Sequence, residues 1–150
     1  MFDAYGRDIH YLRLSVTDLC SLRCRYCMPE GVPKLAHGDI LTYEEFLRLA
    51  ALFARCGVDT VRVTGGEPLV RPGVEQLVAG LKATPGIRKV TMTTNGVRLA
   101  EKLPALLAAG LDSVNISLDT LDAETFRRIT ARDELAHVLE GIRAALASGI

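Results

Sequence analysis

The sequence contains no tryptophan, and aromatic residues make up only 5% of its 150 residues. So few aromatics argue against a platform on which nucleic-acid bases stack. No apolar run approaches the length of a membrane span, and the first residues lack the apolar core of a signal peptide. Eighteen basic and eighteen acidic residues cancel, so the chain as a whole attracts neither nucleic acid nor an anionic membrane. We therefore expect a cytoplasmic protein with no nucleic-acid or membrane partner.

The remaining composition is that of a globular domain, with 49% hydrophobic and 24% charged residues. Apolar periodicity predicts strands that alternate with helices. The strands are expected at 11–17, 59–64, 89–94 and 112–118, and the helices at 42–56, from Pro72 through Leu81, and at 99–109, 122–130 and 134–148. This order favours an α/β fold with a parallel sheet, curled into a partial TIM-like (β/α) barrel made of four βα units. Such barrels usually exceed 200 residues, so we expect residues 1–150 to form one C-terminally incomplete domain.

Three of the four cysteines, Cys20, Cys24 and Cys27, fall within the eight residues CSLRCRYC. A cluster this tight indicates metal or redox chemistry rather than a disulfide framework. A cubane of four irons normally takes four thiolates. Three thiolates would leave one iron open to an exogenous chelating molecule, which is typical of a catalytic site. The spacing therefore favours an iron–sulfur cluster.

Structural zinc is the alternative, and it needs a fourth ligand. Cys56 closes the helix at 42–56 and is placed at the opposite end of the sheet, where we expect it to be a buried small hydrophobe. His10 precedes the first strand and is equally badly placed, whereas His37, in the loop after the cysteines, stays open as a ligand. A zinc-stabilised, non-catalytic barrel fragment therefore remains the rival interpretation.

Polar or glycine-rich segments follow the other three strands as well: Thr64–Pro68 (TGGEP), Thr93–Gly96 (TTNG) and Ser117–Asp119 (SLD). In a parallel α/β fold these segments and the cysteines meet at the carboxyl rim, where such folds bind ligands. Gly65 and Gly66 are expected to allow close approach and positive φ angles that expose backbone groups to a ligand. Glu67 is a candidate acceptor for an ammonium group. An ordinary strand-to-helix turn would show the same residues.

Arg13 and Arg62 lie within apolar segments of the first two strands. Arginines in such places need partners, and an anionic substrate would supply them. Internal ion pairs with Asp119 or Glu67 are the other interpretation.

CSLRCRYC, with an aromatic before the third cysteine, and the downstream TGGEP resemble the radical S-adenosylmethionine superfamily. Within it, GRDIHYLRLSVTDLCSLRCRYCMPEGV, VRVTGGEPLVRPG, TTNG and NISLDTLD closely resemble the GTP 3',8-cyclase family, which catalyses the first step of molybdenum cofactor biosynthesis. Ser21 stands where that family commonly has Asn. A peptide-modifying radical enzyme is the second candidate, although the TDLC and YCMPEGV flanks argue against it.

The resemblance implies a [4Fe-4S] cluster and S-adenosylmethionine as cofactors, with the sulfonium nucleotide chelating the open iron. It implies these roles: cluster ligation by Cys20, Cys24 and Cys27; S-adenosylmethionine contacts by Tyr26, Gly66 and Ser117; and GTP contacts by Arg13, Arg62 and Thr93. The 5'-deoxyadenosyl radical would take hydrogen from the ribose 3' position of GTP, and C3' would then bond to C8 of guanine. No side chain acts as a general acid or base in that abstraction. GTP and an electron donor are the implied partners, and a homodimer is left open.

The resemblance also implies a six-stranded partial barrel, of which this chain supplies the first four βα units. The family then adds a C-terminal region with a second, three-cysteine cluster that binds guanine. No second cysteine triad exists in this sequence.

Overall fold

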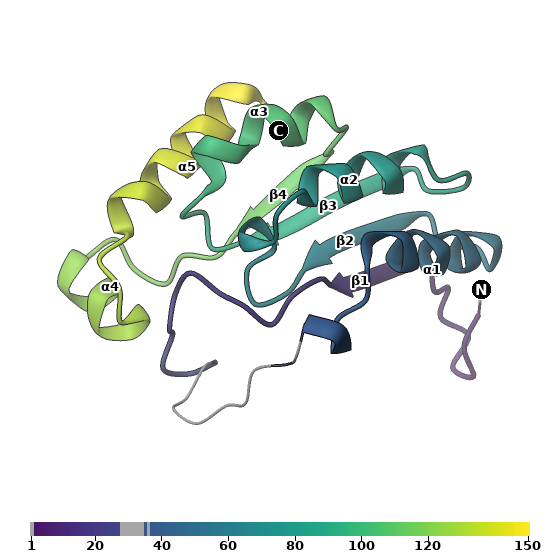
Figure 1. The fold of residues 1–150 in the computed structure, drawn as a ribbon, viewed down its shortest axis with the longest axis horizontal. Coiled ribbons are helices and arrows are strands. Elements are labelled where there is room, and N and C mark those ends of the chain that lie inside the picture. Colours follow the sequence, from purple (N-terminus) through teal and green to yellow (C-terminus); the bar gives the residue numbers. More distant parts are fainter. Residues whose placement is uncertain (1, 28–34, 36) are drawn as a thin grey trace.

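A computed structural model describes residues 2–27, 35 and 37–150, which form a four-stranded parallel sheet in the order β1-β2-β3-β4. The strands are β1 (Tyr11–Ser15), β2 (Thr60–Thr64), β3 (Lys89–Thr94) and β4 (Ser113–Ile116). The helices are α1 (Tyr43–Arg55), α2 (Val74–Ala83), α3 (Leu99–Ala108), α4 (Ala123–Thr130) and α5 (Leu135–Ser148), with short 3-10 turns η1 (His37–Asp39) and η2 (Pro68–Val70). The predicted order of elements is confirmed. In Figure 1 the strands run in one direction, towards α4.

Local sequence sets the helix boundaries. Thr42 and Glu45 form the capping box expected at the start of α1, in which each side chain accepts the other residue's backbone N–H. Pro72, however, does not open α2. That helix begins at Val74, after Gly73 in the left-handed conformation (φ 73°), and it is Pro68 that opens the short turn η2. The prediction of a helix opened by Pro72 was therefore wrong by two residues.

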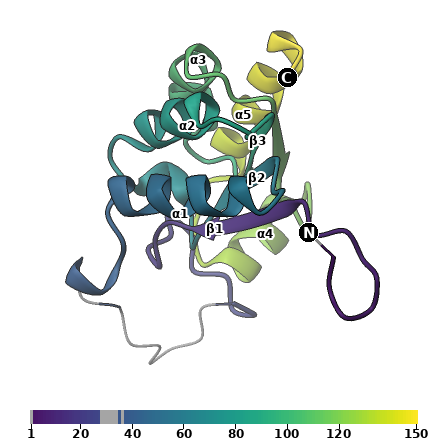
Figure 2. The same ribbon diagram turned by 90° about the vertical axis from the view of Figure 1, so that its right-hand side faces the viewer.

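The sheet buries one face and leaves the other polar. Helices α1, α2, α3 and α5 cover the first face (Figures 1 and 2), where Leu14, Val61, Val63, Val90 and Met92 contribute strand side chains to the main core. Because side chains alternate along a strand, the intervening residues point to the opposite face. The β1–β4 register sets Arg13, Arg62, Thr91 and Ser113 in one row across that face. No helix in the described part of the chain has the length and apolar character to cross a membrane.

Helix α4 ends at Thr130 and is capped by Ala131, the one described residue other than glycine with a positive φ, 53°. The left-handed conformation costs a residue with a Cβ about 1–2 kcal/mol in the folded state. This cost exceeds the destabilisation that glycine causes through the greater conformational entropy of the unfolded chain. Ala131→Gly is therefore expected to raise the free energy of unfolding by about 0.5–1 kcal/mol, measured by urea denaturation. Ala105→Gly, at an exposed position inside α3, is the control and should lower it by about 1 kcal/mol. A destabilised Ala131→Gly would contradict the account of this cap.

Candidate functional site

The cysteine loop, residues 16–27, is attached to the segment that follows β2. The N–H of Val16 donates to the Thr64 carbonyl (2.8 Å), the N–H of Gly66 to the Thr17 carbonyl (2.6 Å) and the N–H of Glu67 to the Leu19 carbonyl (2.7 Å). These bonds extend the pairing of β1 and β2 beyond the strand ends. The approach to Cys20 is thereby fixed at the carboxyl rim of the sheet.

Gly65 and Gly66 are required by this close approach. A Cβ on Gly66 would lie 2.4 Å from the Leu19 carbonyl oxygen, and one on Gly65 would lie 2.7 Å from that of Thr17. Neither glycine has a positive φ, so the expectation of left-handed backbone was wrong. The Gly66 amide is also bound to the protein's own backbone rather than exposed to a ligand.

Helix α4 holds the other end of the cysteine loop. The N–H of Arg23 donates to the Thr130 carbonyl (2.9 Å) and the N–H of Arg25 to the Ile129 carbonyl (3.0 Å). Leu22 and Cys24 are buried in a second apolar cluster, whose other buried members are Phe126, Leu135 and Val138. The loop is therefore held on both sides of the pocket that it borders.

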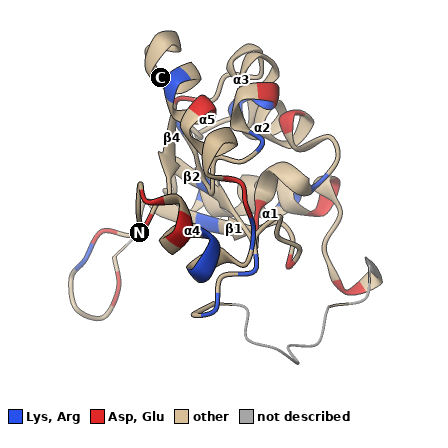
Figure 3. Cartoon of the chain, turned by 90° about the vertical axis from the view of Figure 1, so that its left-hand side faces the viewer, with Lys and Arg blue, Asp and Glu red and all other residues tan. Residues whose placement is uncertain are grey.

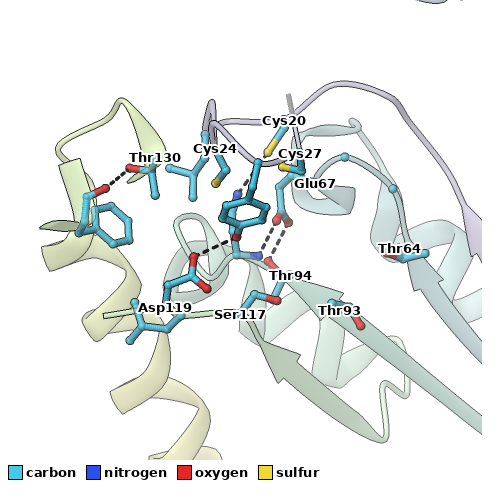
Figure 4. Close-up of a pocket in the computed structure, with 17 residues that line it drawn as sticks. Cys20, Cys24, Cys27, Thr64, Glu67, Thr93, Thr94, Ser117, Asp119 and Thr130 are labelled. Carbon is cyan, nitrogen blue, oxygen red and sulfur yellow. Dashed lines mark hydrogen bonds between the residues drawn. The ribbon is translucent and has the colours of Figure 1, made fainter. Parts of the chain in front are cut away.

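The three clustered cysteines line a single pocket of about 180 Å³ (Figure 4). All three thiols are free: Cys20 is partly buried, Cys24 is buried and Cys27 is exposed. The other lining residues include Thr64–Glu67, Thr93–Asn95 and Ser117–Asp119, so the predicted convergence of four segments at the rim is confirmed. Burial and the neighbouring thiols disfavour a thiolate, which raises the pKa of Cys24 to about 11 and raises that of Cys20 as well.

Zinc and an iron–sulfur cubane require different separations between the thiolates. Among the described residues, no three His, Cys, Asp or Glu side chains converge closely enough to hold one metal ion. Thiolates on one zinc must approach within about 4 Å of each other, given a Zn–S bond of about 2.3 Å. In an iron–sulfur cubane each thiolate binds a different iron and the three lie further apart. Three free thiols around one pocket can each bind a different iron of a cubane.

Of the fourth ligands considered for zinc, Cys56 lies away from the thiol pocket. Cys56 is the C-terminal cap of α1 and does not line the pocket. It is exposed, which corrects the expectation of a buried small hydrophobe, because the turn into Gly57 directs it out of the core. The side chain of His37 lies outside what the structure describes.

Glu67 is a buried side chain that connects the TGGEP and TTNG segments. Its side chain is 1% exposed. One carboxylate oxygen accepts the Thr94 hydroxyl (2.7 Å) and the Leu69 N–H (3.0 Å), and the other accepts the Asn95 N–H (2.7 Å). Burial outweighs these bonds and raises the pKa of Glu67. Both oxygens are thus engaged by the chain itself, and they tie TGGEP to TTNG.

Tyr26 crosses the pocket to the end of β4. Its hydroxyl donates to a carboxylate oxygen of Asp119 at 2.9 Å, and this acceptance raises the pKa of Tyr26 far above its usual range (Figure 4). Ser117 lies beside this contact, and its N–H donates a hydrogen bond to the Thr94 carbonyl (2.9 Å). Tyr26, Gly66 and Ser117, the predicted contacts for S-adenosylmethionine, therefore line the same pocket as the cysteines.

Arg13 and Arg62 are directly paired in the β1–β2 register, on the polar face of the sheet. Figure 3 shows basic positions on both of these strands. Arg62 donates to the Thr91 hydroxyl (3.2 Å) and its guanidinium lies 5.6 Å from the centre of the Tyr11 ring. Within the described part of the chain neither arginine forms an ion pair, so the interpretation as partners of Asp119 or Glu67 was wrong. Those two acids are bound to Tyr26 and to the TTNG segment instead.

Thr93 connects the arginine pair to the pocket. It is two residues beyond Thr91 on the same face of β3, and it lines the pocket that holds the thiols. The three predicted GTP contacts therefore lie on the same polar face of the sheet, and Thr93 also lines the pocket of the thiols.

Sequence reasoning missed the contribution of α4. Phe126 and Thr130 both line the pocket, and Thr130 is buried although polar. Its hydroxyl donates to the Phe126 carbonyl at 2.9 Å. The available signal was their spacing of four residues, which sets them on one face of the helix.

The sequence matches the family model described as the radical SAM superfamily over residues 14–150. The chain belongs to the radical SAM superfamily. Membership implies a [4Fe-4S] cluster and S-adenosylmethionine as cofactors, and the three thiols fit that cluster.

Curated relatives are more specific. A "GTP 3',8-cyclase" of Geobacter sulfurreducens is 54% identical over 150 residues, which are 99% of this chain and 46% of that protein. "Molybdenum cofactor biosynthesis protein 1" of Mus musculus is 52% identical over 148 residues, 98% of this chain and 23% of that protein. This radical SAM chain thus spans about half the length of the bacterial relative and a smaller share of the murine one.

Solved structures confirm the fold. Streptococcus suis SuiB bound to S-adenosylmethionine superimposes with a TM-score of 0.74 at 21% identity, covering 93% of this chain and 32% of SuiB. Methylornithine synthase (PylB) gives a TM-score of 0.69 at 16% identity, covering 95% of this chain and 43% of PylB. The predicted partial (β/α) barrel is therefore confirmed for this radical SAM chain. At these identities the likeness concerns the fold alone.

Proposed function

We propose that the protein acts as a GTP 3',8-cyclase, the enzyme that converts GTP to 3',8-cyclo-7,8-dihydro-GTP in the first step of molybdenum cofactor biosynthesis. One observation carries the proposal: a pocket with three free thiols adjoins a polar sheet face on which Arg13 and Arg62 lie side by side without an ion pair to any described acidic residue. The 54% identity to the Geobacter sulfurreducens "GTP 3',8-cyclase" across nearly the whole chain supports it. Likeness to SuiB does not favour peptide modification to the same degree, because at 21% identity it concerns only the fold.

In this proposal Cys20, Cys24 and Cys27 would hold the cluster, and S-adenosylmethionine would bind at the iron that they leave open. Tyr26, Gly66 and Ser117 line the remaining space of the pocket and would contact that cofactor. When bound, the cluster would supply the reductive cleavage of the sulfonium carbon–sulfur bond of S-adenosylmethionine, with the electron coming from a separate donor. The protein holds the cysteine loop in place from both sides, so its contribution is positioning rather than proton transfer.

Arg13, Arg62 and Thr93 would bind GTP on the polar face. Two guanidinium groups in register on neighbouring strands repel each other unless an anion lies between or above them. Each guanidinium can donate two parallel hydrogen bonds to a phosphate. Thr93 lies between this pair and the pocket, where its hydroxyl can orient the part of the nucleotide that faces the radical.

Anaerobic reconstitution with iron and sulfide, followed by incubation with a low-potential reductant, S-adenosylmethionine and GTP, tests the function. We expect a brown protein and a GTP-dependent product with the mass of 3',8-cyclo-7,8-dihydro-GTP. ATP in place of GTP is the control and should give no cyclised nucleotide. A reconstituted protein that cleaves S-adenosylmethionine but neither binds nor modifies GTP would overturn the substrate assignment, and a colourless zinc protein would overturn the enzyme assignment.

Replacing Arg62 by methionine tests the GTP surface. The loss of charge-assisted hydrogen bonds of about 1.5–3 kcal/mol should raise KM for GTP by roughly 10- to 100-fold. GTP-independent cleavage of S-adenosylmethionine should persist, because Arg62 lies outside the thiol pocket. Arg55→Met, at the exposed end of α1, is the matched control and should leave KM unchanged. Equal KM values for the two variants would remove Arg62 from the GTP site.

The proposal includes the wider setting of the reaction. Residues 1–150 would form the radical SAM core domain and would receive electrons from a separate donor. The four free cysteines are compatible with a reducing cytoplasm. A homodimer is the proposed form to be checked by sedimentation.

A further inference from the structure

Asn95, in the TTNG segment, reaches across the pocket to the first clustered cysteine. Its side-chain Nδ2 lies 3.6 Å from the Sγ of Cys20 and 3.0 Å from the Oγ of Ser21. The contact joins residues separated by 75 positions in the chain. An amide N–H is thus directed at a sulfur that, in the proposed function, binds iron.

The orientation of the Asn95 amide is fixed by the rest of its contacts. Its Oδ1 accepts the N–H of Val97 at 3.1 Å, which leaves the NH₂ group as the part that faces the sulfur. Its backbone N–H donates to the buried carboxylate of Glu67 at 2.7 Å. Glu67 also accepts the Thr94 hydroxyl, so the residue before Asn95 is held by the same carboxylate. The donor is therefore positioned before any cluster binds.

We infer that Asn95 is a positioning residue that sets the reduction potential of the cluster through an N–H···S hydrogen bond to the Cys20 sulfur, an inference that rests on the proposed function. Hydrogen bonds to cysteine sulfurs are one of the main determinants of iron–sulfur potentials. Reduction adds negative charge to the cluster and its thiolates, so a donor stabilises the reduced form more than the oxidised form. Asn95 makes the cluster easier to reduce.

The midpoint potential of the cluster in the reconstituted full chain tests this inference. It is measured by a reductive titration that is monitored by electron paramagnetic resonance. Asn95→Ser keeps a hydroxyl that can accept the Val97 N–H but is too short to reach the sulfur. Its potential should shift to more negative values than that of the parent. Asn95→Asp replaces the donor by a negative charge and should shift the potential further in the same direction. Because the signal comes only from assembled clusters, a variant with reduced iron content still reports its potential.

Ser21→Ala is the matched control. It removes the other acceptor of the Asn95 amide but leaves the N–H···S contact, so its potential should equal that of the parent. Asn95→Ser with an unchanged potential would overturn the inference, as would an equal shift in Ser21→Ala. Either result would leave the proposed function intact, since the parent would still carry a reducible cluster and cyclise GTP. A parent without a cluster would instead refute the proposed function.

Discussion

Cys24→Ala is expected to abolish formation of 5'-deoxyadenosine from S-adenosylmethionine. Removing a residue that only supports a metal ligand commonly lowers metal affinity or activity 10- to 100-fold. Removing the ligand itself should therefore lower the cleavage rate at least about 100-fold. Cys24 is buried against Phe126 and Val138, and alanine fills most of its volume, so the fold should persist. The measurement is the rate of reductant-driven 5'-deoxyadenosine release, with iron content determined on the same sample.

Cys56→Ala is the matched control, because it removes the one cysteine that does not line the pocket. It should retain both the iron and the cleavage rate of the parent. Full activity in Cys24→Ala would exclude that residue as a cluster ligand. Equal losses in both variants would indicate a general effect of cysteine removal rather than a three-thiolate site.

Gly66→Ala should be nearly as damaging, although it removes no ligand. The new Cβ would lie 2.4 Å from the Leu19 carbonyl oxygen and 2.7 Å from that of Asp18, and both are backbone atoms that cannot rotate away. The cysteine loop must shift, and a displacement of about 1 Å in a catalytic constellation can cost about 100-fold. We expect this loss in S-adenosylmethionine cleavage, together with a destabilisation of about 1–3 kcal/mol.

The control for this variant is Gly38→Ala, where an added Cβ meets no described atom within 4 Å and φ is not left-handed. It should match the parent in melting temperature and in cleavage rate. If Gly66→Ala cleaves S-adenosylmethionine at the parental rate, the close approach of TGGEP to the cysteine loop does not position the cluster.

The fold was largely predictable because its signals are local. The alternation of strand and helix patterns and the capping box at Thr42 predicted every strand and α-helix, with errors at their ends, but not the 3-10 turns η1 and η2. The strand expected at 11–17 ends at Ser15. Val16 still bonds to Thr64, but the chain then turns into the cysteine loop, and no strand-internal periodicity marks that turn.

The site was predictable only as far as topology determines it. Parallel strands force the residues after β1, β2, β3 and β4 to one rim, so the convergence of the cysteines, Gly66, Thr93 and Ser117 followed from the order of elements. The contacts between segments did not follow from it. These contacts depend on side-chain positions across more than one element. They include the exposure of Cys56, the binding of Asp119 and Glu67 to partners other than the two arginines, and the contact of the Asn95 amide with Cys20.

Electron paramagnetic resonance of the anaerobically reduced protein, recorded with and without S-adenosylmethionine, tests the central claim most directly. Three protein thiolates and one open iron predict about four irons per chain and a spectrum that changes when the nucleotide chelates that iron. A protein that holds no iron, or a cluster whose spectrum is indifferent to S-adenosylmethionine, would contradict the account.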